Sequence, residues 1–317
     1  MIRRLKYKEI DFKKYADCLE NSEQRKYSAS KDFLDVTANK QWDVLVYNDY
    51  EAVMPVPFIS KKRIKIVHNP LMCQQLGVFS AKDDQKMNER FLHFLQKNYL
   101  VKVYYFNETN SFESKLDTKK NFLLYPGSYT EVFAKYSPKR KRKLRLDDEV
   151  LENSAIKEIS YPKAEKFIRE NVVGLDKEHD SVALLKTLEA FYSLKYLKFF
   201  AFYYHNEITN MIATYSDYDT IALLGTFNDK KYIKMAGAST LIDHVIKENI
   251  ENYIFDFEGG NLPSIEEFFR GFRPELKPYA VIDNSKKALV KNFASLMMRG
   301  KFFLGLLSYV NRYLEWF

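Results

Sequence analysis

The sequence predicts a mixed α/β protein made of two similar halves and a helical tail. Three observations support this class. A length of 317 residues suits two domains, 46% of the residues are apolar, and the same order of elements occurs twice, about 150 residues apart. Hairpins that lead into a strand–helix–strand unit are typical of mixed sheets with helices on their faces. We expect domains at 1–134 and 135–283, and a tail at 284–317.

The first half opens with a polar helix near Asp11–Glu20. A hairpin follows, because apolar residues alternate along Trp42–Tyr47 and Glu51–Phe58. Helical spacing of Phe91, Phe94 and Leu95 then predicts a helix over Lys82–Tyr99. The strand Val101–Phe106 closes this half.

The second half repeats this order after two helices. The helices are expected at Lys163–Val173 and Val182–Leu194. The elements that follow are strands at Phe199–Tyr204, Ile208–Ser216 and Ile221–Phe227, a helix at Ala236–Asn249 and a strand at Tyr253–Phe257. The repeated order favours a structural duplication.

The tail, Ser285–Phe317, has apolar residues at steps of three and four, which predicts an amphipathic helix. We expect it to pack on the domains. Lys and Arg beside Phe and Trp316 leave peripheral attachment to a membrane surface as the alternative.

Composition excludes several classes of protein. No run reaches the ~18 apolar residues of a membrane span, and Cys18 and Cys73 are too few for a disulfide framework. We therefore expect a cytoplasmic protein. The five histidines lack metal-ligand spacing, so no metal is expected. No P-loop, nucleophile elbow or dinucleotide-binding motif occurs.

One segment carries most of the net charge of +8. Lys135–Arg145 contains seven basic residues and no acidic one. Ser137 and Pro138 predict a helix start there, and bases in a first turn oppose the helix dipole by ~0.3–1 kcal/mol each. We expect an anion to be bound here by Lys139, Arg140 and Arg142; a solvated basic face is the alternative.

The stretch 221–279 is the most informative window. A strand ends at Phe227, a polar loop follows, and a helix begins near Gly237. Free N–H groups at a helix start attract anions, and a glycine lets a ligand approach the main chain. Asn261, Phe268-Phe269 and Gly271-Phe272 come after the next strand.

This window resembles the GNAT acyltransferase superfamily, whose pyrophosphate loop reads Arg/Gln-x-x-Gly-x-Gly/Ala and is followed by a helix, a strand, an Asn and an aromatic before Gly-Phe. Here the loop is Lys234–Ser239, with Lys in place of Arg/Gln and Ser in place of the second small residue. The stretch FDFEGG…EEFFRGF is similar to the branch with FemAB-type peptidyltransferases and BioF2-like acetyltransferase domains, which carry two GNAT-like domains in tandem. The resemblance covers most of residues 30–283.

The resemblance implies transfer of an acyl group from a CoA thioester or an aminoacyl-tRNA to an amine. The residues that it assigns to the acyl-CoA site are Phe227, Lys234, Met235, Ala236, Gly237, Ala238, Ser239 and Asn261. GNAT enzymes often use a tyrosine as general acid just before Gly-Phe. Phe268 and Phe269 stand there in this chain, so that hydroxyl is missing.

The candidate general bases are Asp256 and Glu258, at the end of the expected strand 253–257. Residues two apart on an extended segment point to the same face. The alternative is that one of them bonds nearby backbone or Arg270. Tyr215 is a candidate proton donor.

Three functions remain open. The first is an N-acyltransferase that uses acyl-CoA (acetyl-CoA) and a small-molecule or peptide amine acceptor. The second is an aminoacyl-tRNA-dependent peptidyltransferase, with tRNA as a partner of the basic helix. The third is a non-catalytic scaffold that binds an anion or a membrane. The first half lacks a comparable glycine loop, unless Gly77 serves, and is expected to shape the acceptor site.

Overall fold

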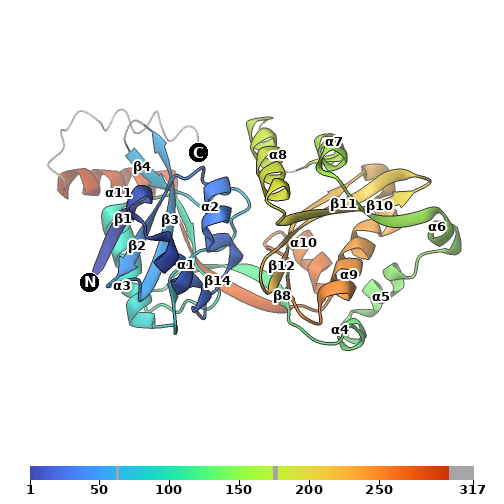
Figure 1. The fold of residues 1–317 in the computed structure, drawn as a ribbon, viewed down its shortest axis with the longest axis horizontal. Coiled ribbons are helices and arrows are strands. Elements are labelled where there is room, and N and C mark those ends of the chain that lie inside the picture. Colours follow the sequence, from blue (N-terminus) through green and yellow to red (C-terminus); the bar gives the residue numbers. More distant parts are fainter. Residues whose placement is uncertain (62–63, 174–177, 300–317) are drawn as a thin grey trace. The chain divides into compact units, whose positions relative to one another are not determined.

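The computed structural model describes residues 1–61, 64–173 and 178–299, which form two compact units (Figure 1). Unit 1 contains residues 1–119 together with the chain from Pro278 onward, and unit 2 contains Lys120–Lys277. The chain therefore enters unit 2 before the boundary expected at residue 135. The reason is that Phe122 and Leu124 are buried in the core of unit 2.

The sheet of unit 1 is mostly antiparallel. Its strand order is β1-β2-β3-β4-β6, and β5 pairs with β3. Among its described residues the parallel pair is β4–β6, where Ile66 lies opposite Leu100. The strands are β1 (Ile2–Lys6), β2 (Trp42–Tyr47), β3 (Ala52–Lys61), β4 (Ile64–Val67), β5 (Phe79–Ser80) and β6 (Leu100–Val101).

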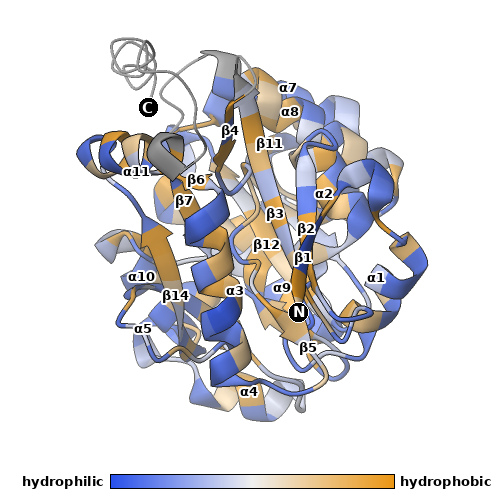
Figure 2. Cartoon of the chain, turned by 90° about the vertical axis from the view of Figure 1, so that its left-hand side faces the viewer, coloured by the Kyte–Doolittle hydropathy of each residue, from blue (hydrophilic) through white to orange (hydrophobic). Residues whose placement is uncertain are grey.

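Three helices belong to the first part of unit 1: α1 (Phe12–Glu20), α2 (Lys31–Thr37) and α3 (Gln85–Asn98). α3 connects the parallel strands β4 and β6. Phe91, Leu92 and Leu95 recur on one side of α3 and are buried, as their helical spacing predicts. Figure 2 shows hydrophobic residues along β3 and mainly hydrophilic residues on α1 and α3.

The last described part of the chain, residues 278–299, belongs to unit 1. Residues Val281–Asp283 of β14 (Glu275–Asp283) pair with β7 (Val103–Tyr105). The helix α11 (Lys286–Arg299) buries Leu289 and Phe293 against β4 and β6. This is the described part of the expected tail; residues 300–317 lie outside the described residues.

Unit 2 is built on a second mixed sheet, with strand order β8-β13-β12-β11-β10-β9. β12 and β13 are parallel, and the other pairs are antiparallel. The strands are β8 (Asp117–Leu124), β9 (Ser154–Ile159), β10 (Leu197–Tyr204), β11 (Glu207–Ser216), β12 (Thr220–Asn228) and β13 (Ile254–Asp256).

Helices cover both faces of this sheet. Phe199 of β10 contacts Tyr161 and Tyr192, which belong to α7 (Tyr161–Asn171) and α8 (Glu178–Ser193). On the opposite face Phe202 joins a core with Leu241 and Ile242 of α9 (Gly237–Asn249). The remaining helices are α4 (Tyr129–Lys135), α5 (Pro138–Leu144), α6 (Asp148–Asn153) and α10 (Pro263–Arg270).

The predicted mixed α/β class and both strand–helix–strand units are present. None of the helices in the described ranges has the length and hydrophobicity of a membrane span. The prediction did not include β1, β8, β9, β14 and α10. β8 begins with the polar run Asp117–Asn121, and β14 contains Pro278. Both features are unfavourable to a strand until its neighbours are known.

Candidate functional site

The centre of unit 2 is the place where β12 and β13 separate. These parallel strands pair only from Thr220 to Ala222 and from Ile254 to Asp256. β12 continues to Asn228 beside β11 alone. The main-chain groups of the second part of β12 therefore have no partner in β13, which leaves an edge that can receive a ligand.

A β-bulge lies next to this separation. Ala213 pairs with Gly225 and Thr214 with Leu223, so Leu224 is an extra residue on β12. Bulges bend a strand and are frequent beside active sites. Gly225 is needed locally, because a Cβ there would lie 2.8 Å from the ring of Phe227. Phe227 is buried and belongs to the packing of β12.

The helix α9 begins after β12, as the sequence predicts. A short 3-10 segment, Lys230–Met235, is followed by Ala236 in the left-handed region with φ of 59°. No side chain caps the first turn of α9. Its N-terminal N–H groups and positive dipole end are therefore available to an external anion. Lys234 of the loop is exposed and Met235 is half-buried.

Gly237 has a different role from the one expected of it. The sequence predicts that its missing side chain admits a ligand. In the structure a Cβ on Gly237 would lie 2.0 Å from Oδ1 of Asn210 and 3.1 Å from the ring of Phe202. Gly237 thus lets α9 approach β10 and β11. Ala238, the next residue, is half-buried.

The candidate bases lie on a tight loop at the end of β13. Asp256 is fully buried, and its Oδ1 accepts a hydrogen bond of 2.8 Å from the backbone N–H of Glu258. The expected alternation stops here, because Glu258 has a φ of 52° and is not extended. A non-glycine residue in this region is uncommon and often marks a functional loop.

This loop is fixed from β8. Gly259 donates to Oδ1 of Asn121 at 3.1 Å, and Oδ1 of Asn261 accepts from the backbone of Lys120 at 2.9 Å. Gly260 has a φ of 126°, and a Cβ there would lie 2.4 Å from the ring of Phe122. Asn261 therefore anchors the loop through its Oδ1.

The sheet register brings two of the predicted catalytic residues to one face. Tyr215 pairs with Ala222, and Ala222 pairs with Asp256. Paired residues point to the same face, and two strand spacings amount to roughly 10 Å. The small Ala222 lies between them. Tyr215 is buried and stacks on Tyr196, with ring centroids 5.3 Å apart.

Arg140 is the most unusual charged residue of unit 2, because its side chain is buried (4% exposed). Nη1 donates to the hydroxyl of Ser239 in the first turn of α9, and Nη2 donates to the carbonyl of Phe268 at 2.7 Å. The guanidinium carbon lies 4.4 Å and 4.2 Å from the ring centroids of Phe268 and Phe272.

The Gly-Phe pair of the sequence resemblance is explained by this packing. A Cβ at Gly271 would lie 2.9 Å from Nε of Arg140. Phe272 forms one wall of the guanidinium site. Phe268 stands where GNAT enzymes often have a tyrosine, and it forms the other wall. Phe269 is buried against Phe257, with ring centroids 4.8 Å apart.

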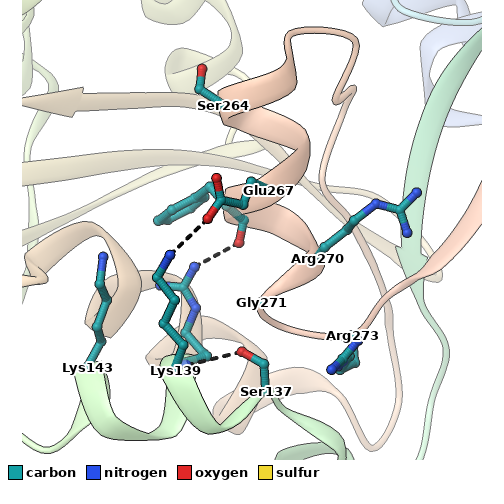
Figure 3. A pocket seen from close by; sticks show the side chains of 10 residues that line it. Ser137, Lys139, Lys143, Ser264, Glu267, Arg270, Gly271 and Arg273 are labelled. Atoms are coloured by element: carbon teal, nitrogen blue, oxygen red, sulfur yellow. Dashed lines mark hydrogen bonds and ion pairs between the residues drawn. The ribbon is translucent and has the colours of Figure 1, made fainter.

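A pocket of about 420 Å³ lies between α5 and α10 (Figure 3). Lys139 lines it and forms an ion pair of 2.8 Å with Glu267. Arg142, which the sequence groups with Lys139 and Arg140, does not line it. The full set of lining residues is Ser137, Lys139, Arg140, Lys143, Ser264, Glu267, Phe268, Arg270, Gly271 and Arg273.

Sequence reasoning did not assign three basic residues of this pocket to an anion site. Lys143 lies in the basic segment, whereas Arg270 and Arg273 lie more than a hundred residues further along the chain. The spacing of the cations gives no signal, because α5 and α10 become neighbours only through tertiary packing. Glu267, Phe268, Arg270 and Gly271 belong to the EEFFRGF stretch of the resemblance, which does not itself indicate a pocket.

Comparison with known proteins gives matches by structure alone. No protein-family model matches the sequence, and no curated protein matches it. The solved structure of FemX matches with a TM-score of 0.59 at 7% identity, over 87% of this chain and 96% of that one. A tandem GNAT protein from the clavulanic acid biosynthesis pathway matches with a TM-score of 0.50 at 7% identity, over 89% and 97%.

A third solved structure, L-PGS from Bacillus licheniformis, matches with a TM-score of 0.50 at 12% identity, over 92% of this chain and 97% of that one. Each match spans nearly the whole of the other chain. At these identities the likeness concerns the fold. With the parallel pair and crossing helix present in both units, the chain shares its fold with FemX and with the tandem GNAT protein.

Proposed function

We propose that this protein is an acyltransferase that moves an acyl group from an acyl-CoA to an amine. The observation that carries this proposal is the uncapped start of α9 beside the point where β12 and β13 separate. An anionic group of the donor would bind the N–H groups of Ala238 and Ser239. The free edge of β12 would align the acyl arm.

The chemistry requires a base that takes a proton from the acceptor ammonium. Glu258 is the candidate, because it is half-buried in the left-handed loop at the end of β13. Asp256 acts as a positioning residue, since its carboxylate holds the backbone N–H of Glu258. Tyr215 shares its face and is the candidate proton donor to the leaving thiolate.

The test is a thermal-shift titration with acetyl-CoA and longer acyl-CoAs. A ligand that binds only the folded protein raises the melting temperature as its concentration rises. The informative variant is Ala236→Asp, which places a carboxylate at the uncapped start of α9. Aspartate tolerates the left-handed conformation of this position, so the fold should persist while the donor site is blocked.

The matched control is Gln85→Asp, which adds the same charge to the first turn of α3 in unit 1. We expect a rise in melting temperature for the native protein and the control, and a loss of at least about tenfold in apparent affinity for Ala236→Asp. If acyl-CoA raised the melting temperature of the two variants equally, the donor would not bind at the start of α9. No shift with any acyl-CoA would overturn the proposal.

An aminoacyl-tRNA donor is the second candidate, and the exposed bases Arg142, Lys143 and Arg145 of the α5 segment favour it. Binding of RNA through such side chains depends steeply on salt. A tRNA that competes with acetyl-CoA, with an affinity that falls as salt rises, would support this candidate over the first. Indifference to tRNA would exclude it.

A further inference from the structure

Unit 2 contains a buried positive charge, Arg140, that forms no ion pair within the described residues. In the described part of the chain no carboxylate lies within ion-pair distance of Arg140. The two groups that accept hydrogen bonds from it, the Ser239 hydroxyl and the Phe268 carbonyl, are neutral. Its buried Nε has no hydrogen-bond partner among the described residues. A guanidinium in such surroundings is costly, because a buried charge normally has an ionic partner.

The position of Arg140 increases this cost. Its Nη1 meets the first turn of α9, where the helix dipole is positive and disfavours a cation. Burial lowers the pKa of Arg140 to about 10. The nearby Asp243 carboxylate opposes this lowering. The side chain therefore stays protonated at neutral pH, and it does so without a direct ion pair.

The pocket beside Arg140 adds further cations. Five of its lining residues are basic and one, Glu267, is acidic. Glu267 is engaged by Lys139 at 2.8 Å, and Arg270 is engaged by Glu266 at 2.7 Å. Within the described ranges no ion pair involves Lys143 or Arg273, and both side chains are exposed. Figure 3 shows the pocket with these side chains around it.

We propose that the pocket between α5 and α10 binds a phosphate group, as a phosphate monoester or a pyrophosphate. Lys143 and Arg273 supply the free charges, and the buried Arg140 supplies a fixed positive field at the floor. Guanidinium groups match the geometry of phosphate oxygens. A volume of about 420 Å³ accommodates two phosphate groups. The proposal does not depend on acyl transfer.

The first experiment is calorimetric titration with inorganic pyrophosphate. The titration is performed on the native protein and on the Ala236→Asp protein. In the variant the start of α9 is blocked, so any pyrophosphate that binds does so elsewhere. The test variant is Lys143→Ala/Arg273→Ala, and Arg145→Ala and Arg145→Ala/Lys135→Ala are the controls of equal charge type outside the pocket. Because these side chains are exposed, each variant should fold, and circular dichroism checks this.

We expect pyrophosphate to bind the native and Ala236→Asp proteins, and binding to weaken by about tenfold or more in the pocket double variant. The controls should change affinity by less than about threefold. A second readout is the NMR resonance of Nε–H of Arg140, which should shift on titration. Absence of binding, or equal weakening in the controls and the pocket variant, would overturn the proposal.

Two further ligands identify the source of the phosphate. If the group belongs to CoA, CoA should displace pyrophosphate from the Ala236→Asp protein more strongly than dephospho-CoA. If the pocket binds free phosphate, inorganic phosphate should displace pyrophosphate, whereas CoA and dephospho-CoA should both displace it weakly and to the same extent. Both results support a phosphate site. Competition by acetate at the same concentration as phosphate would contradict the preference for phosphate.

Discussion

The two crossover helices, α3 in unit 1 and α9 in unit 2, occupy the same place in similar sheets but begin differently. Each connects a pair of parallel strands, β4–β6 or β12–β13. The start of α3 is capped by Asp84, whose carboxylate accepts from the N–H of Met87 at 3.0 Å. The start of α9 has no side-chain cap. The first helix carries its own anion, whereas the second leaves that position open.

The glycines near the two helices also differ. Gly77 comes well before α3, and a Cβ there would lie 2.2 Å from Oδ1 of Asn110. Its N–H donates to the Tyr104 hydroxyl at 3.1 Å. Gly77 is thus buried in the packing of unit 1. Gly237 is the first residue of α9. Gly237 also serves packing, because a Cβ there would lie 2.0 Å from Oδ1 of Asn210. The two glycines therefore differ in position and not in role, and the contrast between the helices lies in their caps.

The largest expected effect on stability is that of Gly237→Ala. The added methyl would overlap Asn210, so we expect a loss of about 2 kcal/mol in the free energy of unfolding. Urea denaturation measures it, with Gln85→Ala at the start of α3 as the control. In a double-mutant cycle the penalty should shrink when Asn210 is also changed to Ala. If Gly237→Ala left the free energy of unfolding unchanged, α9 would not need a glycine at this position and the contrast with α3 would not hold.

The next effect concerns the caps. Asp84→Ala should lower the free energy of unfolding by about 1 kcal/mol, because it removes the cap of α3. Ala236→Gly at the corresponding start of α9 should not destabilise the protein, since no side-chain cap is lost and glycine favours the left-handed conformation. Denaturant midpoints of the two variants test this. A similar loss in both would show that the two helix starts are equivalent.

The smallest effect is a pH dependence from Asp243 on α9. Burial, the main cause, raises the pKa of this carboxyl, while the Tyr129 hydroxyl, which donates to it at 2.9 Å, opposes the rise. A raised acid pKa means that the folded state holds the proton more tightly than the unfolded state. The associated stability is present near and below the ordinary pKa of 3.8 and is lost as pH rises through the folded-state pKa.

Asp243→Asn should therefore reduce the fall in stability as pH is raised from about 4 to about 7. The measurement is the urea midpoint across this range. Glu248→Gln on the exposed face of α9 is the control and should leave the pH profile unchanged. On α3 the buried polar residue is the neutral Asn88, so this helix has no corresponding titrating group. An identical profile for Asp243→Asn and the native protein would count against this assignment.

Much of the fold could be predicted because local patterns encode it. The helices α3 and α9 follow from apolar residues at helical spacing, and β10 to β12 follow from alternating and aromatic runs. β8 and β14 could not be predicted, because neither polar residues nor a proline indicate a strand. The boundary at Lys120 lies within β8, so it could not be predicted without that strand.

The candidate site was predicted in parts. The loop Lys234–Ser239, the strand end at Asp256 and the basic helix could be named from their order along the chain. The sequence could not show that Gly237 packs on Asn210, that Glu258 is left-handed, or that Tyr215 shares a face with Asp256. These facts depend on strand register and on residues distant in sequence.

The sequence by itself therefore determined the class of the fold, the duplicated order of its elements and the segments that carry chemistry. It did so because helix and strand periodicity and helix starts are local properties. Only the tertiary structure decided that Arg140 is buried between Phe268 and Phe272 and that Arg273 joins Lys143 around one pocket. The energetic effect of a charged side chain depends on its desolvation and on its neighbours, and both are set only when distant segments pack.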